Sequence, residues 1–302
     1  MRSESSSDPY PLPATRYPLS PDFLVVGHVT RDLVPGGWKL GGTASYAAHV
    51  AAHLGQRCAL LTSAAPELDL STLLPCVEIS CIASERGTVF EHFFAGERRI
   101  QYVRDQAASI GPDEVPAFLR RASAVLLGPV FGEVDPSLVS SFPGSLIGAT
   151  AQGWLRRLEA DGRLSEGHTA DLAIEILAGR LTALFLSEED LDGTPLPESW
   201  ISALPILVVT RGRLGARLCI EGTWWQMPAF PSREVDATGA GDAFAAAFLI
   251  RYHETEKPSD AARFAAAVAS FVVEAPGITG APTGAQVEAR LQAHPELRLS
   301  RL

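Results

Sequence analysis

The stretch that decides the fold is Asp236-Ala237-Thr238-Gly239-Ala240-Gly241-Asp242, which is followed directly by the apolar, helix-favouring run Ala243–Tyr252. The first turn of a helix leaves its backbone N–H groups without internal acceptors. Gly239, Ala240 and Gly241 carry no bulky side chains that would cover those amides. The sequence therefore predicts an anion-binding site at the positive end of a helix that begins near residue 242.

Asp242 is an unusual neighbour for an anion site, because a carboxylate repels a bound phosphate. It is suited instead to take a proton from a hydroxyl that attacks the phosphate. A structural interpretation also exists, since an acidic residue in a first helical turn contributes about 0.3–1 kcal/mol through the helix dipole. The small residues that precede Asp242 favour the catalytic interpretation.

Short apolar segments alternate with helical patterns along the chain. This order predicts an α/β fold, a mostly parallel doubly wound sheet with helices on both faces. The expected strands are Phe23–Gly27, Cys58–Ser63, Ala124–Gly128, Leu146–Ala149, Ala183–Leu186, Ile206–Thr210 and Ala216–Glu221. The expected helices are Thr43–Leu54, Thr169–Ala178, Ala243–Tyr252 and Ser259–Glu274.

The segment Arg86–Val103 departs from this alternation. Thr88–Phe94 is rich in β-branched and aromatic residues, Ala95–Glu97 suits a turn, and Arg99–Val103 returns, which predicts a hairpin. We expect a small β lid around residues 30–40 and 86–104, on an α/β domain that spans 22–302. Residues 1–21, rich in Pro and Ser, are expected to form a disordered tail.

Phenylalanines at positions 90, 93 and 94 give the hairpin a large aromatic area. They could close on a substrate, supply a slot for a nucleoside base, or pack against a second copy of the chain, and they suggest a homodimer formed through the lid.

Composition excludes several classes of protein. The formal net charge of −10 disfavours nucleic acid as a partner. No apolar run approaches the ~18 residues of a membrane span. None of the four cysteines forms a CxxC pair, and the N-terminus lacks the apolar core of a signal peptide, so we expect a cytoplasmic protein.

His49 and His53 are spaced like half a zinc site but lack the glutamate of HExxH. We therefore expect the two histidines to have a packing role.

Asp236–Asp242 resembles the DTxGAGD signature of the ribokinase-like (PfkB) carbohydrate kinases, which move the γ-phosphate of ATP to an alcohol. The resemblance extends from about Phe23 to the C-terminal helices. Three further segments and the hairpin match the family in type and order. They are Gly27–Asp32, like the first-strand substrate motif; Gly41–Gly42, like the N-terminal glycine pair; and Val208–Gly212 with Gly215, like the nucleotide-side loop.

The resemblance implies a role for each matching residue. Asp242 would be the general base, and Gly239, Ala240 and Gly241 would hold the transferred phosphoryl group. The acceptor would be bound by Asp32, Thr30, Gly41, Gly42 and Thr43, and the nucleotide by Ser187, Thr210, Arg211, Gly212, Gly215 and Thr238. ATP and Mg²⁺ would be the cofactors, with Glu188 or Asp190 reaching the metal through water, although a plain acidic turn explains this pair equally well. A potassium ion near Asp236 and Thr238 is also implied.

The acceptor side departs from the family pattern. Thr30 stands where the family commonly has Asn, and Ser187-Glu188-Glu189-Asp190 stands in place of NxxE. Thr150-Ala151-Gln152, with Arg156 further on, replaces the DPNxR-like segment. These departures argue against ribose or fructose and resemble members of the family that phosphorylate inositol-like polyols. The predicted acceptor is a sugar or an inositol-like polyol. A nucleoside kinase and a catalytically silent ligand-binding homologue remain alternatives. A dinucleotide oxidoreductase is disfavoured because no GxGxxG follows the first strand.

Overall fold

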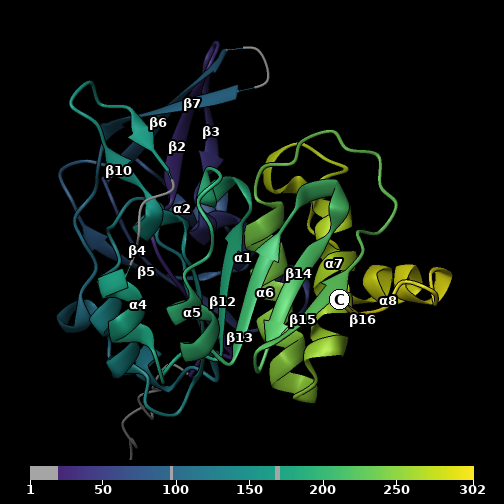
Figure 1. Cartoon of the computed structure of the whole chain (residues 1–302). Helices are drawn as coiled ribbons and strands as arrows, with labels where there is room; N and C mark the ends of the chain where they lie inside the picture. Colours follow the sequence, from purple (N-terminus) through teal and green to yellow (C-terminus); the bar gives the residue numbers. More distant parts are fainter. Residues whose placement is uncertain (1–19, 96–97, 167–170) are drawn as a thin grey trace, which may run out of the picture.

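The computed structural model of the chain describes residues 20–95, 98–166 and 171–302 (Figure 1). Its main feature is a ten-stranded sheet. In spatial order the strands are β16 (Ser300–Arg301), β15 (Thr223–Met227), β14 (Ala216–Ile220), β13 (Ile206–Thr210), β12 (Ala183–Ser187), β9 (Leu146–Thr150), β8 (Ala124–Leu127), β1 (Phe23–Val26), β4 (Cys58–Ala64) and β5 (Glu78–Ala83). The run from β13 to β5 is parallel, whereas β14, β15 and β16 pair antiparallel.

Helices cover both faces of this sheet. They are α1 (Thr43–His53), α2 (Leu70–Leu73), α3 (Gln152–Leu155), α4 (Asp171–Leu177), α5 (Glu198–Ala203), α6 (Ala240–Thr255), α7 (Pro258–Val272) and α8 (Gly284–Ala293). α1, α6 and α7 lie on one face and α4 and α5 on the other (Figure 1). Phe23 and Val25 of β1 face the first layer, while Leu24 and Val26 face the second. This two-sided burial explains why the central strands are continuously apolar.

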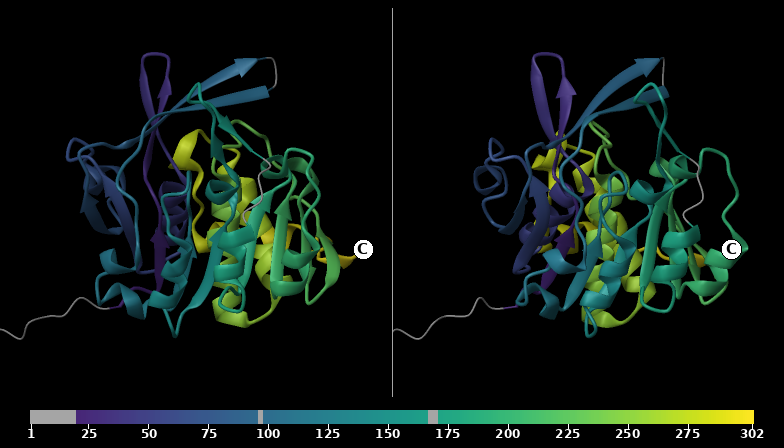
Figure 2. Two further views of the ribbon diagram at one scale, coloured as in Figure 1. Left: turned by 60° about the vertical axis from the view of Figure 1, so that its left-hand side comes forward. Right: turned by 90° about the vertical axis from the view of Figure 1, so that its left-hand side faces the viewer.

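A second sheet of four strands projects from one end of the large sheet (Figure 2). Its order is β3 (Gly37–Gly41), β2 (Thr30–Val34), β6 (Thr88–Ala95) and β7 (Arg98–Asp105). β2 follows the carboxyl end of β1, and β6 follows β5, so the chain enters this sheet twice from the same edge. A short ribbon, β10 (Arg157–Leu158) with β11 (Leu164–Ser165), contacts β7.

The fold class predicted from the sequence is confirmed. Helix α6 extends three residues beyond the predicted helix Ala243–Tyr252 at each end, and α1 and α7 agree with prediction to within two residues at each end. The expected tail lies outside the described residues as far as residue 19, as do residues 169–170 of the helix expected at Thr169–Ala178. No helix in the described ranges is both long and apolar enough to cross a membrane.

Candidate functional site

The amino end of α6 lies within the predicted segment Asp236–Asp242. Gly239 is the N-cap residue, with φ +78°, and Asp242 lies in the first turn. The Ala240 amide donates a hydrogen bond to the carbonyl of Ala237 at 3.3 Å. No backbone carbonyl in the described part of the chain accepts a hydrogen bond from the amides of Gly239 or Gly241. Two of the three predicted amides therefore remain available to an anion, and the third is shared.

Tyr46 of α1 forms one wall of this site. Its ring stands so close to Gly239 that a Cβ added there would lie 2.0 Å from the ring. Burial raises the pKa of the Tyr46 hydroxyl, and the nearby carboxylates of Asp236, Asp32 and Asp242 raise it further. The predicted base and the predicted acceptor carboxylate, more than two hundred residues apart in the sequence, thus lie near one phenol ring.

Asp32 is held by its neighbours at the base of the four-stranded sheet. The Thr30 hydroxyl donates a hydrogen bond to its Oδ1 at 2.8 Å. A Cβ at Gly41 would lie 2.4 Å from its Oδ2, so the glycine lets the backbone of β3 approach the carboxylate. Gly42 has φ +86°, and a Cβ there would lie 2.5 Å from the His28 carbonyl oxygen. Thr43 is buried against Gly128.

Asp236 fixes the loop that precedes α6. Its Oδ1 accepts a hydrogen bond from the Thr238 amide at 3.0 Å, and its Oδ2 accepts one from the Gly277 amide at 3.2 Å. Lys39 of β3 places Nζ 4.0 Å from Oδ2. Partial burial acts to raise the pKa of Asp236, but the hydrogen bonds and Lys39 outweigh it, so the pKa lies below its ordinary value. Lys39 thereby brings a positive charge to the edge of the anion site.

The predicted nucleotide loop borders the same site. The Thr210 hydroxyl donates to the Leu186 carbonyl at 3.4 Å and lies 3.9 Å from where a Cβ of Gly241 would be. Beyond it the turn closes when the Arg211 amide donates to the carbonyl of Gly215 at 2.7 Å. Gly215 has φ +84°, and a Cβ there would meet the Met227 carbonyl at 2.0 Å. Gly212, also at positive φ, has open space around it.

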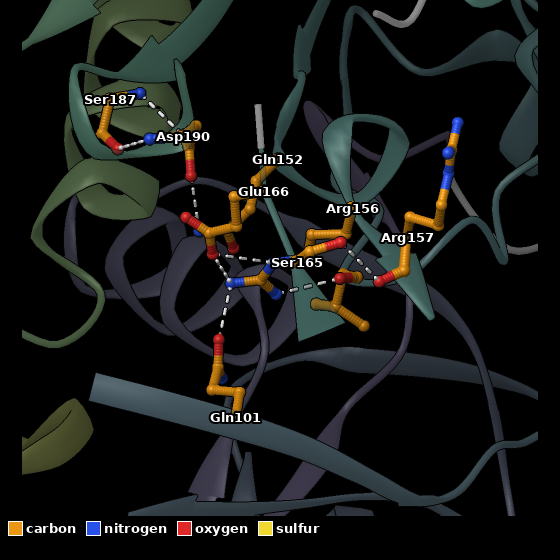
Figure 3. Close-up of polar contacts among 9 residues, drawn as sticks. Gln101, Gln152, Arg156, Arg157, Ser165, Glu166, Ser187 and Asp190 are labelled. Carbon is orange, nitrogen blue, oxygen red and sulfur yellow. Dashed lines mark hydrogen bonds and ion pairs between the residues drawn. The ribbon is translucent and has the colours of Figure 1, made fainter. Parts of the chain in front are cut away.

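The acidic segment after β12 divides into two parts. The Asp190 carboxylate accepts hydrogen bonds from the Ser187 amide at 2.7 Å and the Gln152 side-chain amide at 3.0 Å, and it is buried (Figure 3). Glu188 instead is 57% exposed and pairs with Arg211 at 3.3 Å. Within the residues that the structure describes, no group of three or more His, Cys, Asp or Glu side chains could hold a metal ion.

The aromatic residues of the lid do not share one surface. Phe90 is buried against Val130 and Leu164. Phe93 is 46% exposed and packs edge-to-face on Tyr102, with ring centroids 5.6 Å apart. The side chain of Phe94 lies outside what the structure describes. A homodimer formed through the lid stays a prediction.

The sequence alone assigned no role to Tyr46, Lys39 or His92. His92 lies in β6 with Nε2 3.3 Å from Asp32 Oδ2. The alternation of a strand places residues 90 and 92 on one face, and this is the signal that could have drawn attention to His92. The approach of Tyr46 to Gly239 depends on how α1 packs beside α6 and leaves no local trace in the sequence.

Comparison with known proteins gives a family match to part of the chain and a curated relative. Residues 177–283 match the family model described as pfkB family carbohydrate kinase. A nucleoside kinase of Methanocaldococcus jannaschii is 34% identical over 99 residues, 32% of this chain, and the chain spans about a third of that relative's length.

Two solved structures share the fold. One is a pyrophosphate-dependent kinase in the ribokinase family, complexed with a pyrophosphate analog and myo-inositol. It is 24% identical, with a TM-score of 0.71 over 84% of this chain and 96% of that one. The other is Arabidopsis thaliana ribokinase complexed with ribose and ATP, 20% identical, with a TM-score of 0.69 over 91% and 99%. Residues 177–283 therefore resemble the pfkB family of carbohydrate kinases, and the chain as a whole shares the fold of these two kinases.

Proposed function

We propose that this chain transfers the γ-phosphoryl group of ATP to a hydroxyl of a sugar or polyol. The observation that carries the proposal is that Lys39, opposite Asp32 in the hairpin, reaches Asp236 before α6, while Asp242 lies in the first turn of that helix. The unoccupied amides of Gly239 and Gly241 lie in the same turn. This arrangement supplies an acceptor-binding carboxylate, a proton-accepting carboxylate and an anion-binding helix end in one place.

The reaction follows from these groups. Asp242 takes the proton of the acceptor hydroxyl as its oxygen bonds to the γ-phosphorus, and the bond from phosphorus to the leaving oxygen of ADP breaks. The amides of Gly239 and Gly241, with that of Ala240, donate hydrogen bonds to the phosphoryl oxygens. Because these donors are fixed by the fold before the reaction, they stabilise the transferring charge without rearranging.

The two substrates approach from different elements. Thr30 and Asp32 of β2, with the Gly41–Thr43 segment where β3 leads into α1, bind the acceptor. The loops after β12 and β13, with Ser187, Thr210, Arg211, Gly212 and Gly215, bind the nucleotide, and Thr238 joins them from the loop before α6. Closure of the lid over the acceptor excludes water that would otherwise hydrolyse ATP.

Mg²⁺ would neutralise phosphate charge in this reaction. The exposed carboxylate of Glu188 suits a metal held through water. Asp190 fits this task less well, because both of its oxygens already accept hydrogen bonds from the protein. A potassium ion near Asp236 and Thr238 stays a prediction from the sequence.

The test is a phosphoryl-transfer assay with Mg²⁺ against pentoses, hexoses, inositols and nucleosides. ATP and pyrophosphate are tried separately as donors, because one of the structural neighbours is described as pyrophosphate-dependent. We expect product with ATP and at least one sugar or polyol. Ligand binding without transfer to any acceptor would support a catalytically silent homologue, and turnover of nucleosides alone would support a nucleoside kinase.

The base assignment has its own prediction. Asp242→Asn should lower kcat by about 10²–10⁴-fold, because the amide cannot accept the proton. The affinity for the donor, measured by calorimetry, should change little. An Asn variant that turns over at the wild-type rate would contradict the assignment even if the chain is a kinase.

A further inference from the structure

The inner face of the lid is a row of polar side chains. In the strand register Asp32 of β2 stands opposite Phe90 of β6, and His92 stands opposite Gln101 of β7. Because side chains two residues apart share a face of the sheet, Asp32, His92 and Gln101 all point to the side on which Phe90 is buried. Phe93 belongs to the opposite face, where it meets Tyr102.

His92 has an unsatisfied nitrogen on this face. Its Nε2 atom is buried and has no hydrogen-bond partner in the described part of the chain, although Asp32 Oδ2 lies 3.3 Å away. The side chains of His92 and Asp32 are only 13% and 17% exposed. Buried polar atoms almost always find a partner in proteins. Because His92 Nε2 lacks a hydrogen-bond partner and lies beside the predicted acceptor carboxylate, the geometry indicates a ligand group that forms the missing hydrogen bond.

Gln101, which lies opposite His92 in β7, is held by a buried arginine. The buried guanidinium of Arg156 donates hydrogen bonds to Gln101 Oε1 at 2.9 Å and to the Val130 carbonyl at 3.0 Å, and it lies 3.3 Å from the Glu166 carboxylate (Figure 3). These contacts fix β7 to the body of the molecule at the position opposite His92. Arg156 therefore ties β7, the strand paired with the one that carries His92, to residues outside the lid.

We infer that His92 is a specificity-determining residue that binds the acceptor together with Asp32. The inference rests on the proposed function. Asp32 Oδ2 accepts a hydrogen bond from one acceptor hydroxyl, and His92 Nε2 makes a hydrogen bond with the adjacent one. Two polar atoms 3.3 Å apart suit neighbouring hydroxyls of one molecule. The acceptor class is a non-aromatic polyhydroxy compound with adjacent hydroxyls.

The lid offers less to a nucleoside base. Stacking on a base requires an aromatic face turned to the ligand. Phe90 is buried against Val130 and Leu164, and Phe93 is on the outer face. The residues that line the inner face near Asp32 carry hydrogen-bonding groups instead. The geometry thus favours recognition of hydroxyls over recognition of a base.

The experiment pairs variants of His92 with acceptors that lack one hydroxyl. The acceptor is the compound that the wild-type enzyme phosphorylates best in the assay above, together with its single deoxy analogues. We expect His92→Leu to raise the acceptor KM about 10–100-fold with kcat changed less than about threefold, and His92→Asn to restore part of the affinity. One deoxy analogue should bind about 10–100-fold worse than its parent to the wild type, yet nearly as well as its parent to His92→Leu.

Two controls keep the outcomes separate. His253→Asn, at an exposed position of α6, should leave KM unchanged. Imidazole NMR signals of wild-type enzyme labelled with ¹⁵N-histidine report contact directly, and His92 should shift when the acceptor is added without donor. A wild type that phosphorylates nothing refutes the proposed function. If the wild type is active but its His92 signal does not shift, the inference is wrong. It is also wrong if every deoxy analogue loses as much affinity in His92→Leu as it does in the wild type.

Discussion

Gly239 must be a glycine for two reasons, its positive φ and the close approach of the Tyr46 ring. Its φ of +78° is a conformation in which a side chain costs about 1–2 kcal/mol, and the Tyr46 ring occupies the place of a Cβ. The backbone of the glycine-containing turn before α6 therefore lies directly against the Tyr46 ring. Any side chain at Gly239 would push the turn and the ring apart, and with them the Gly239 and Gly241 amides.

Gly239→Ala tests this contact. We expect a loss of about 2–5 kcal/mol in the free energy of unfolding, from strain and overpacking together, and a loss of phosphoryl transfer. Urea unfolding measures the first effect. Gly193→Ala is the matched control, because Gly193 has the same φ of +78° with no atom in the way. If both variants lose the same stability, the Tyr46 contact contributes nothing.

At the scale of elements, the hairpin of β2 and β3 carries a lysine as well as Asp32, the proposed acceptor-binding carboxylate. Lys39 stands opposite Asp32 in the register of this hairpin and reaches Asp236 at the mouth of α6. The carboxylates of Asp236, Asp32 and Asp242 lie near enough to raise the pKa of the Tyr46 hydroxyl, so an incoming phosphate meets a negative field there. Lys39 is suited to offset that field. Because it is 58% exposed, its ion pair adds little to stability.

Lys39→Met should therefore leave the fold intact and lower kcat for phosphoryl transfer about 10–100-fold. The matched control is Lys257→Met, since Lys39 and Lys257 are the only lysines in the chain and Lys257 is exposed at the start of α7. Partial acetylation followed by mass spectrometry gives a second measurement, in which bound donor should protect Lys39 and not Lys257. Equal kcat for the two variants would exclude Lys39 from the reaction.

The elements differ in how far the sequence could predict them. The start of α6 was predictable because small residues and an apolar run are local signals. β5 (Glu78–Ala83) was missed because a strand at the edge of the sheet is half exposed and lacks the continuous apolar pattern of β4. The pairing of His92 with Gln101, and of Asp32 with Lys39, depends on strand register, which no single segment specifies.

At the scale of the whole molecule, the fold was predictable because alternating apolar strands and helices admit few arrangements. The site was predictable only in part. Residues that follow the carboxyl ends of parallel strands converge in any such sheet, which explains why Thr210 and the end of α6 meet. Tyr46 and His92 come together with them through the packing of α1 and the lid, and that packing is set by contacts far apart in the chain.

Acidification should weaken the whole molecule in two stages. Burial, with the adjacent His53, lowers the pKa of His49 from 6.5 to about 4. The unfolded chain therefore binds more protons than the folded one between these values, and stability falls as pH drops from about 6.5 to 4. Hydrogen-bonded carboxylates such as Asp236 have lowered pKa values, so their contribution is lost only at lower pH, below about 4. Because His49 is only partly buried, we expect its share to be about 1 kcal/mol, well below the full value of such a shift.

Urea unfolding at pH 7 and pH 4.5 should show this loss in the wild type and in His253→Asn, and a smaller loss in His49→Gln. An equal loss in all three proteins would assign the first stage to other groups.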